Sequence, residues 1–475
     1  MDPATAAKNS NEAVAVGIKN AKAIVSCDSG DQVYWDSDIL IEGPKITEIG
    51  KDIEAEGAEI IRGDGKFVYP GLINTHHHFF QTFVRNLTSI DYPNLMVMDW
   101  IDKIYRIFQI IDSDVIYYSS LTALGDLIKH GCTCAFDHQY CYTNKTGKTP
   151  VDRQMEAAGL LGIRYHAGRG TNTLSRAEGS SIPDNMLETT DEFLKDCERL
   201  IGLYHDPGAF SMRQIVMAPC QPINCTRDTF KETVSMARDK GVRMHTHLGE
   251  GENEGMVARW GKRTMDWCAE LGFIGEDVWY AHDWEVTPEE YRVLASTKTG
   301  VSHCPSPAIL GGFPILNIKE MLEAGINISL GCDGSATNDS SNLLDALRIA
   351  YLMQTYHSKQ RGGCASAYEM LKVATINGAK TLGRPDLGSL EPGKAADLFM
   401  IDTAVLELTG ALHDPKNIIA RAGLTGPVWM TMINGNVVYR DGALTGVDEE
   451  RLAAEGEALC SRVIREPSEA FRNLI

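Results

Sequence analysis

The chain has 475 residues, of which 43% are hydrophobic and 23% charged, proportions that exclude a disordered or fibrous protein and suit a globular one. Because one core stops growing well below this length, we expect one large domain and a smaller one. The formal net charge of −19 repels phosphate backbones and anionic membrane surfaces, which argues against nucleic acid and membranes as partners.

The chain carries no sign of a targeting or membrane segment. Residues 1–15 lack a basic region followed by an apolar run, and no stretch approaches the roughly 18 uninterrupted apolar residues of a membrane helix. The 12 cysteines are irregularly spaced without a Cys-x-x-Cys pair, so we expect buried free thiols. These features predict a cytoplasmic protein.

Both ends of the chain read as short strands separated by turns. The predicted strands cover residues 14–27, 38–41, 45–49 and 58–69, then 387–402 and 428–439. Asn434-Gly435 predicts a two-residue hairpin turn within the last range. Since neither group closes a core alone, we predict that residues 1–69 and 387–475 form one β-sandwich domain. A separate domain at each end is the alternative.

Residues 70–386 alternate strand-like with helical runs, as βα units require. Eight strands are predicted to end near His78, Asp137, Gly168, Cys220, His247, His282, His303 and Asp333. Helices are predicted at 114–130, 191–205, 228–240, 288–294 and 342–354, and residues 287–290 form a capping box. The pattern predicts an α/β fold with a (β/α)8 TIM-type barrel. A doubly wound sheet is the alternative, but no Gly-x-Gly-x-x-Gly opens a helix.

Three consecutive histidines follow the first barrel strand. On a strand, His76 and His78 would face one way and His77 the other. Two imidazoles on one face can chelate a transition metal such as zinc. An isolated His-x-His is more often a solvated cluster, so this interpretation depends on the residues downstream.

A second His-x-His ends the strand near His247, and Glu250 follows three residues later. If His247 binds a metal, the Glu250 carboxylate lies within reach of a bound water and can take its proton. His245 is better explained as a packing or supporting histidine, because one metal seldom needs every imidazole.

Further polar residues end the later barrel strands: His282, His303 and Asp333. Each alone is a weak signal, since Asp-Gly is usually a turn and a strand-end histidine is usually a satisfied polar group. Together they are specific, because the carboxyl ends of successive barrel strands converge on one site.

With these residues the chain resembles the aminohydrolase branch of the amidohydrolase superfamily. The matching motifs are residues 70–78, His247-x-x-Glu250, His282 and Asp333-Gly334. Within the branch, residues 76–87, 131–140, 166–170 and 335–342 are similar to 8-oxoguanine deaminases and hydroxy-triazine ethylaminohydrolases.

The resemblance implies one divalent metal, zinc or else iron, held by His76, His78, His247 and Asp333. Binuclear relatives need a bridging lysine or acid near the end of the fourth strand, where this chain has Met217-Ala218-Pro219-Cys220. A single metal is therefore expected, with Cys220 as a less favoured substitute ligand.

The resemblance also implies a hydrolytic deaminase that acts on an amino-substituted N-heterocycle, a purine or hydroxy-triazine, and releases ammonia or a small amine. Glu250 and Asp333 would take the water's proton, Glu250 would protonate the ring, and His282 would orient the water. Hydrolysis of a carbon–halogen bond or ring amide is the alternative, and a non-catalytic binding protein is a third. A homodimer or a higher homo-oligomer is implied by analogy.

Substrate contacts are predicted from positions just after strand ends, because a flat polar ring needs hydrogen bonds at its rim and apolar walls. We expect Gln81, Arg169 and His303 at the rim, and Phe79, Phe80 and Trp100 as walls. Each is open to a structural explanation, for example Arg169 as a salt-bridge residue.

Overall fold

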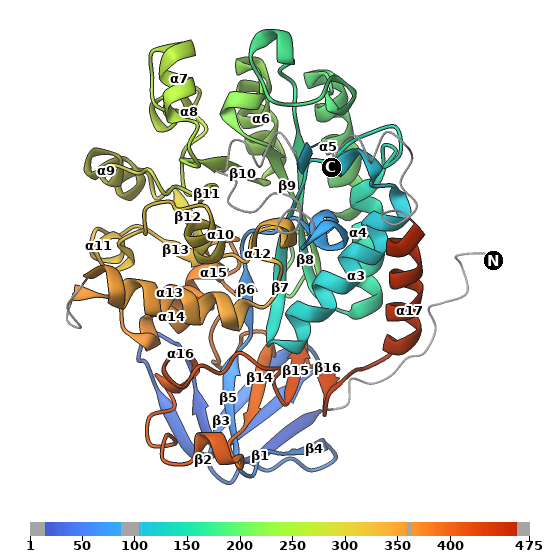
Figure 1. Cartoon of the computed structure of the whole chain (residues 1–475). Coiled ribbons are helices and arrows are strands. Elements are labelled where there is room, and N and C mark those ends of the chain that lie inside the picture. The colour runs from blue at the N-terminus through green and yellow to red at the C-terminus, as the bar shows by residue number, and fades with distance from the viewer. Residues whose placement is uncertain (1–14, 87–103, 106, 359–362, 463–475) are drawn as a thin grey trace.

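The structure is a computed structural model that describes residues 15–86, 104–105, 107–358 and 363–462. An eight-stranded parallel sheet curls into a barrel, and a nine-stranded sheet built from both ends of the chain lies beneath it (Figure 1). This architecture confirms the predicted fold class. The domain boundaries at residues 69 and 386 stay predictions.

The barrel strands follow one another in chain order around the sheet. They are β6 (Leu72–Asn74), β7 (Cys132–Gln139), β8 (Arg164–Thr171), β9 (Arg213–Pro219), β10 (Arg243–Leu248), β11 (Val278–His282), β12 (Gly300–His303) and β13 (Ile328–Leu330). The first and last strands meet where Thr75 N donates to Leu330 O (3.0 Å) and Asp333 N to His76 O (3.0 Å). We call this junction of β6 and β13 the barrel seam.

Helices cover the outside of the barrel, so its strands are largely buried, and β7 and β8 are buried along their whole lengths although both contain polar residues. The helices that follow the barrel strands are α3 (Ser113–Lys129), α4 (Pro150–Leu161), α5 (Thr190–Tyr204), α6 (Arg227–Lys240), α7 (Asn253–Trp260), α8 (Thr264–Glu270), α9 (Pro288–Thr297), α10 (Pro305–Leu310), α11 (Ile318–Glu323), α12 (Ser335–Asn338), α13 (Leu343–Ser358), α14 (Ala367–Val373) and α15 (Ile376–Thr381). The predicted capping box is confirmed, because Thr287 accepts from Glu290 N and the Glu290 side chain accepts from Thr287 N.

The two ends of the chain pair as predicted, because β5 lies antiparallel to β14 in the terminal sheet. Its strands are β1 (Val16–Val25), β2 (Val33–Glu42), β3 (Lys45–Gly50), β4 (Glu59–Arg62), β5 (Lys66–Pro70), β14 (Leu398–Asp402), β15 (Met430–Ile433), β16 (Asn436–Arg440) and β17 (Ala443–Leu444). Asn434 and Gly435 have φ of 54° and 79°, so they form the predicted tight hairpin turn. Near the C-terminal end, α16 (Ile418–Ala422) and α17 (Glu449–Cys460) complete the fold, and α17 packs on α3.

Two local expectations differ from the structure. The range 58–69 is two strands, β4 and β5, because residues 63–65 turn the chain between them. The first barrel strand ends at Asn74, so His76 and His78 lie in the loop after it and turn into the barrel mouth. Ten of the cysteines are buried free thiols, as expected, whereas Cys364 and Cys460 are half-buried. No helix in the described part of the chain has both the length and the apolar composition to cross a bilayer.

Candidate metal centre

The four predicted metal ligands come together at the carboxyl ends of the barrel strands. His78 Nε2 lies 3.0 Å from His247 Nε2, and Asp333 Oδ1 lies 3.3 Å from His78 Nε2 and 3.4 Å from His76 Nε2. All four side chains are buried. The loops after β6 and β13 and the end of β10 therefore supply one compact cluster of nitrogen and oxygen atoms.

Hydrogen bonds fix which ring nitrogen of each histidine carries the proton. His78 Nδ1 lies 2.9 Å from His138 O, and His247 Nδ1 lies 2.7 Å from Cys220 O. A carbonyl oxygen only accepts, so each Nδ1 carries the hydrogen and each Nε2 keeps a bare lone pair.

His76 reaches the same state through a second histidine. His245 Nδ1 donates to Trp279 O (3.0 Å), which leaves His245 Nε2 to accept from His76 Nδ1 (2.9 Å). His76 Nε2 is therefore bare as well, and it is buried without a hydrogen-bond partner. His245 supports the ligand His76, as the sequence interpretation favoured. Such supporting contacts fix the orientation of metal-binding histidines.

The cluster is electrostatically incomplete by itself. Two bare Nε2 lone pairs 3.0 Å apart repel each other, and burial opposes protonation: it lowers the pKa of His78 to about 3 and that of His76 well below its usual value. A divalent cation would satisfy all of these lone pairs together. The separations of 3.0–3.4 Å approach the roughly 3.4 Å edge of a tetrahedron with zinc bonds of about 2.1 Å. The donor set therefore fits zinc.

Glu250 and His282 lie beside this cluster, with Glu250 Oε1 3.7 Å from His282 Nε2. Burial, followed by the charges of Asp333 and Glu252, raises the pKa of Glu250 well above its usual value, so its carboxyl group holds a proton readily. His282 has φ of 74° and Asp333 has φ of 65°, conformations that non-glycine residues avoid.

Glu252 holds the backbone beside Glu250 and was not identified from the sequence. Its carboxylate is buried and accepts from Gly249 N and Glu250 N, both at 2.7 Å. Gly249 and Gly251 have φ of 69° and 97°, which lets the loop curl around this carboxylate. The Gly-Glu-Gly-Glu run after His247 is the signal that pointed to such a turn.

His138 is a second residue that the sequence interpretation missed. It lies near the end of β7, its ring stacks on that of His247 with centroids 4.8 Å apart, and its Nε2 donates to Ala218 O (2.7 Å). The signal available was a polar run, Asp137-His138-Gln139, at the end of a strand whose other side chains are mainly apolar.

A small cavity of about 30 Å³ adjoins the ligands. Besides His78, His247, Glu250 and Asp333, it is lined by Gln81, Ile104, Tyr105, Tyr140, Cys220, Gln221, Asn224 and Thr337. The predicted rim residue Gln81 is thus beside the site. Cys220 lies on the wall but belongs to none of the converging ligand clusters found in the described part of the chain.

Arg169 and His303 do not line this cavity. The Arg169 guanidinium donates to Asp196 (2.8 Å) and to both oxygens of Glu188 (2.7 Å each), and it lies 3.7 Å above the ring of Tyr142. His303 is buried at the end of β12, and burial lowers its pKa to about 4, so it is neutral.

The three predicted aromatic walls have different outcomes. Phe79 and Phe80 are fully buried, and Phe80 packs edge-on against Tyr140 on the cavity wall. Trp100 lies outside the described residues.

Comparison with known proteins places this site in a family. Residues 67–438 match the model of the amidohydrolase family. The chain is 48% identical over 452 residues to hydroxydechloroatrazine ethylaminohydrolase of Pseudomonas sp. (strain ADP), covering 93% of this chain and 94% of that protein. It is 32% identical over 455 residues to 8-oxoguanine deaminase of Pseudomonas aeruginosa, covering 94% and 98%.

A solved structure agrees with these matches. Atrazine chlorohydrolase from Arthrobacter aurescens, complexed with zinc, superposes with a TM-score of 0.90 at 30% identity, over 94% of this chain and all of that one. The family match covers most of the chain, and the relatives match over nearly their full lengths. The chain therefore belongs to the amidohydrolase family.

Proposed function

We propose that the protein is a zinc-dependent hydrolytic deaminase, with one ion per chain, that acts on an amino-substituted N-heterocycle and releases ammonia or a small amine. One observation carries this proposal: three bare Nε2 lone pairs converge with Asp333 beside Glu250, a carboxyl group that holds a proton readily. The relatives named as an ethylaminohydrolase and an 8-oxoguanine deaminase support it.

A zinc ion held by His76, His78, His247 and Asp333 would supply Lewis-acid chemistry that lowers the pKa of a bound water toward about 7. The protein's own groups then move the protons. Glu250 would deliver a proton to the ring nitrogen next to the carbon under attack as the carbon–oxygen bond forms. Glu250 and Asp333 would take up the proton that the attacking water loses, and Glu250 would pass it to the amine, so that the carbon–nitrogen bond breaks in a second step. His282 would orient the attacking oxygen by hydrogen bonding, and Asp333 would help Glu250 to accept the proton that the attacking water loses.

The cavity has room for about one water molecule, but the side chains that line it suit the edge of a flat polar ring. Gln81, Gln221 and Asn224 present amide groups, which pair with the alternating donors and acceptors of a heterocycle's edge. Ile104 and Tyr105 supply apolar surface. We assign substrate contact to Gln81 first. The Arg169 guanidinium already donates hydrogen bonds to Glu188 and Asp196, so Arg169 is the least favoured of the three predicted rim residues.

Hydrolysis of a carbon–halogen bond is the second candidate, favoured by the likeness to an atrazine chlorohydrolase. The same acid and ligands would serve a chloride leaving group. The cytoplasmic location and the homodimer stay predictions.

A panel of substrates separates the two candidates. Zinc-loaded protein is incubated with 8-oxoguanine, isoxanthopterin, a hydroxylated ethylamino-triazine and a chlorinated triazine, and ammonia, ethylamine and chloride are measured. We expect amine or ammonia release from at least one non-halogenated ring. Chloride release alone would favour the second candidate, and no release at all would contradict both.

Glu250→Gln tests the assigned acid. It keeps the size of the side chain but not its proton transfer, so kcat should fall by roughly 10²–10⁴-fold while zinc content stays near one per chain. Glu254→Gln, an exposed glutamate on the first turn of α7, is the matched control and should keep kcat unchanged. Full activity of Glu250→Gln would contradict its role.

A further inference from the structure

The middle histidine of the 76–78 motif is not used by the proposed site. His77 is fully buried, and its Nδ1 accepts from His78 N (2.8 Å). Its Nε2 therefore carries the proton and donates to Ser341 Oγ (2.9 Å). A buried histidine with both nitrogens engaged fixes the backbone of the neighbouring ligand His78.

Ser341 joins three separate parts of the chain. It follows α12, on the same connection from β13 that carries Asp333, and it is 1% exposed. Its N–H donates to Asp126 Oδ2 on α3 (3.1 Å), and its hydroxyl lies 3.4 Å from Ser335 Oγ. The loops after β6 and β13 are therefore linked to each other and to a helix outside the barrel.

These contacts cross the barrel seam, where the proposed metal ligands lie on both sides. His76 and His78 come from the loop after β6, and Asp333 follows β13. Their coordinating atoms are 3.3–3.4 Å apart across the junction. Movement at the seam would therefore change the separation of the ligands directly.

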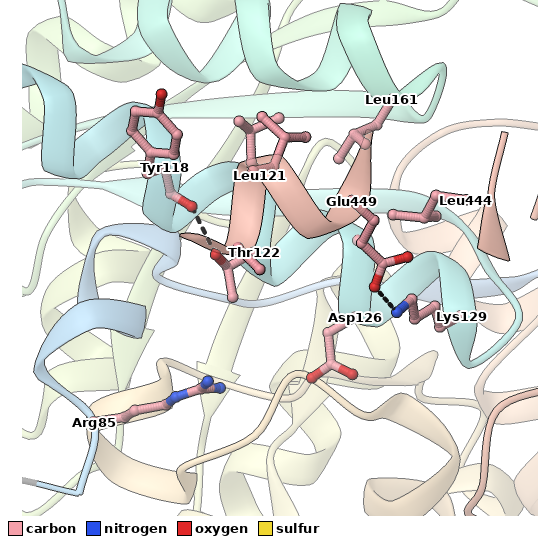
Figure 2. A pocket seen from close by; sticks show the side chains of 12 residues that line it. Arg85, Tyr118, Leu121, Thr122, Asp126, Lys129, Leu161, Leu444 and Glu449 are labelled. Atoms are coloured by element: carbon pink, nitrogen blue, oxygen red, sulfur yellow. Dashed lines mark hydrogen bonds and ion pairs between the residues drawn. The ribbon is translucent and has the colours of Figure 1, made fainter. Parts of the chain in front are cut away.

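We propose that His77, Ser341 and Asp126 form a seam clamp, a set of positioning residues that holds His78 and Asp333 at coordinating distance. The proposal rests on the metal centre assigned above. Asp126 also lines a groove of about 400 Å³ between α3 and α17, so the clamp reaches from the buried ligands to the outer surface of the barrel (Figure 2). In that groove Asp126 lies near Lys129, which pairs with Glu449 of α17.

The experiment measures zinc release into excess chelator from the zinc-loaded full chain, which requires no substrate. Ser341→Ala and His77→Asn each remove the His77–Ser341 hydrogen bond and should speed release by about 10–100-fold, the usual effect of losing a partner that orients a metal ligand. Asp126→Ala should speed release less, by about two- to fivefold, because at Ser341 its carboxylate holds the backbone N–H and not the hydroxyl that binds His77. The same carboxylate also pairs with His130 (3.0 Å), so the melting temperature of this variant is compared with that of the wild type. Ser340→Ala is the matched control, because its hydroxyl makes a local turn bond to Asn342 N, and it should release zinc at the wild-type rate.

A double variant separates the clamp from general loss of stability. Ser341→Ala and His77→Asn break the same hydrogen bond, so together they should speed release no more than the stronger of the two alone. The melting temperature of each zinc-free variant is measured alongside.

Three results would overturn the clamp: wild-type release rates in Ser341→Ala, additive effects in the double variant, or faster release only in proportion to a lower melting temperature. A wild-type chain that binds no zinc would instead contradict the metal centre and the clamp together. Zinc binding without amine release in the substrate panel would contradict the proposed function alone.

Discussion

The two ends of the barrel each bury a polar cluster, and they differ in how its atoms are satisfied. At the amino ends of the strands, Arg164 begins β8 and is fully buried. Its five N–H groups donate to Asp397, Asn434 and the carbonyls of Phe210 and Ser211, at 2.6–3.1 Å. This cluster joins the barrel to the terminal sheet and needs no further partner.

At the carboxyl ends, His76 Nε2 and both ring nitrogens of His282 are buried without any hydrogen-bond partner, and bare lone pairs face one another. Most buried polar atoms of folded proteins have a hydrogen-bond partner, so a group of bare lone pairs that face one another indicates a bound partner. Both clusters are equally buried, so burial alone does not separate a structural cluster from a functional one. The two clusters differ in whether each donor and acceptor has a partner within the protein.

Metal removal tests the unsatisfied end and carries the largest expected effect. Chelation should reduce activity by roughly 10³-fold or more, because the cluster alone cannot activate water, and added zinc should restore it. The melting temperature should fall as well, since the ion binds the folded state. Full activity in protein shown to be metal-free would remove the distinction between the two ends.

Asp397→Ala tests the satisfied end. Removing one partner of a buried ion pair leaves Arg164 uncompensated, which should cost about 3–5 kcal/mol in the free energy of unfolding. Zinc content and kcat per folded chain should not change. Asp402→Ala, which breaks the more exposed pair with Lys66, is the control and should cost about 1 kcal/mol or less in denaturant unfolding. Equal losses of unfolding free energy in the two variants would mean that the buried Arg164 cluster contributes no more to stability than an exposed ion pair.

Arg169→Met is expected to have the smallest effect and decides between two interpretations of one residue. Its ion pairs with Glu188 and Asp196 predict a loss of about 2–3 kcal/mol in stability, with KM changed by less than about twofold. A tenfold rise in KM with unchanged stability would instead support the substrate contact expected from the sequence. Steady-state kinetics and denaturant unfolding of one preparation give both quantities.

The sequence predicted the elements of this fold because each has a local signal. Eight strand-like runs alternate with helical ones, six of them were predicted to end at a histidine or an aspartate, and two groups of short strands at the chain ends had to share a core. Asn434-Gly435 specified a hairpin through its backbone preferences alone. The first barrel strand was predicted too long because residues 75–78 contain no glycine or proline that would mark its end at Asn74.

Three supporting residues of the site were missed in the sequence for a physical reason. Glu252, His138 and Ser341 act through backbone groups and side chains brought near by the fold, and their residue types are common in loops. The proposed ligand set came from the resemblance to the aminohydrolase branch. The residues alone pointed to the strand ends, because zinc restricts the residue types that bind it and the ends of barrel strands converge.

The proposed ligands follow the first and last barrel strands as well as lying on β10, and this spread along the chain has a consequence during protein synthesis. Thr75 and Leu330, which join across the junction, are separated by 255 positions. A nascent chain therefore displays its histidines long before the carboxylate of Asp333 leaves the ribosome. The complete set of ligands forms only after the last barrel strand has paired with the first. Tight binding of the metal ion would therefore follow closure of the barrel.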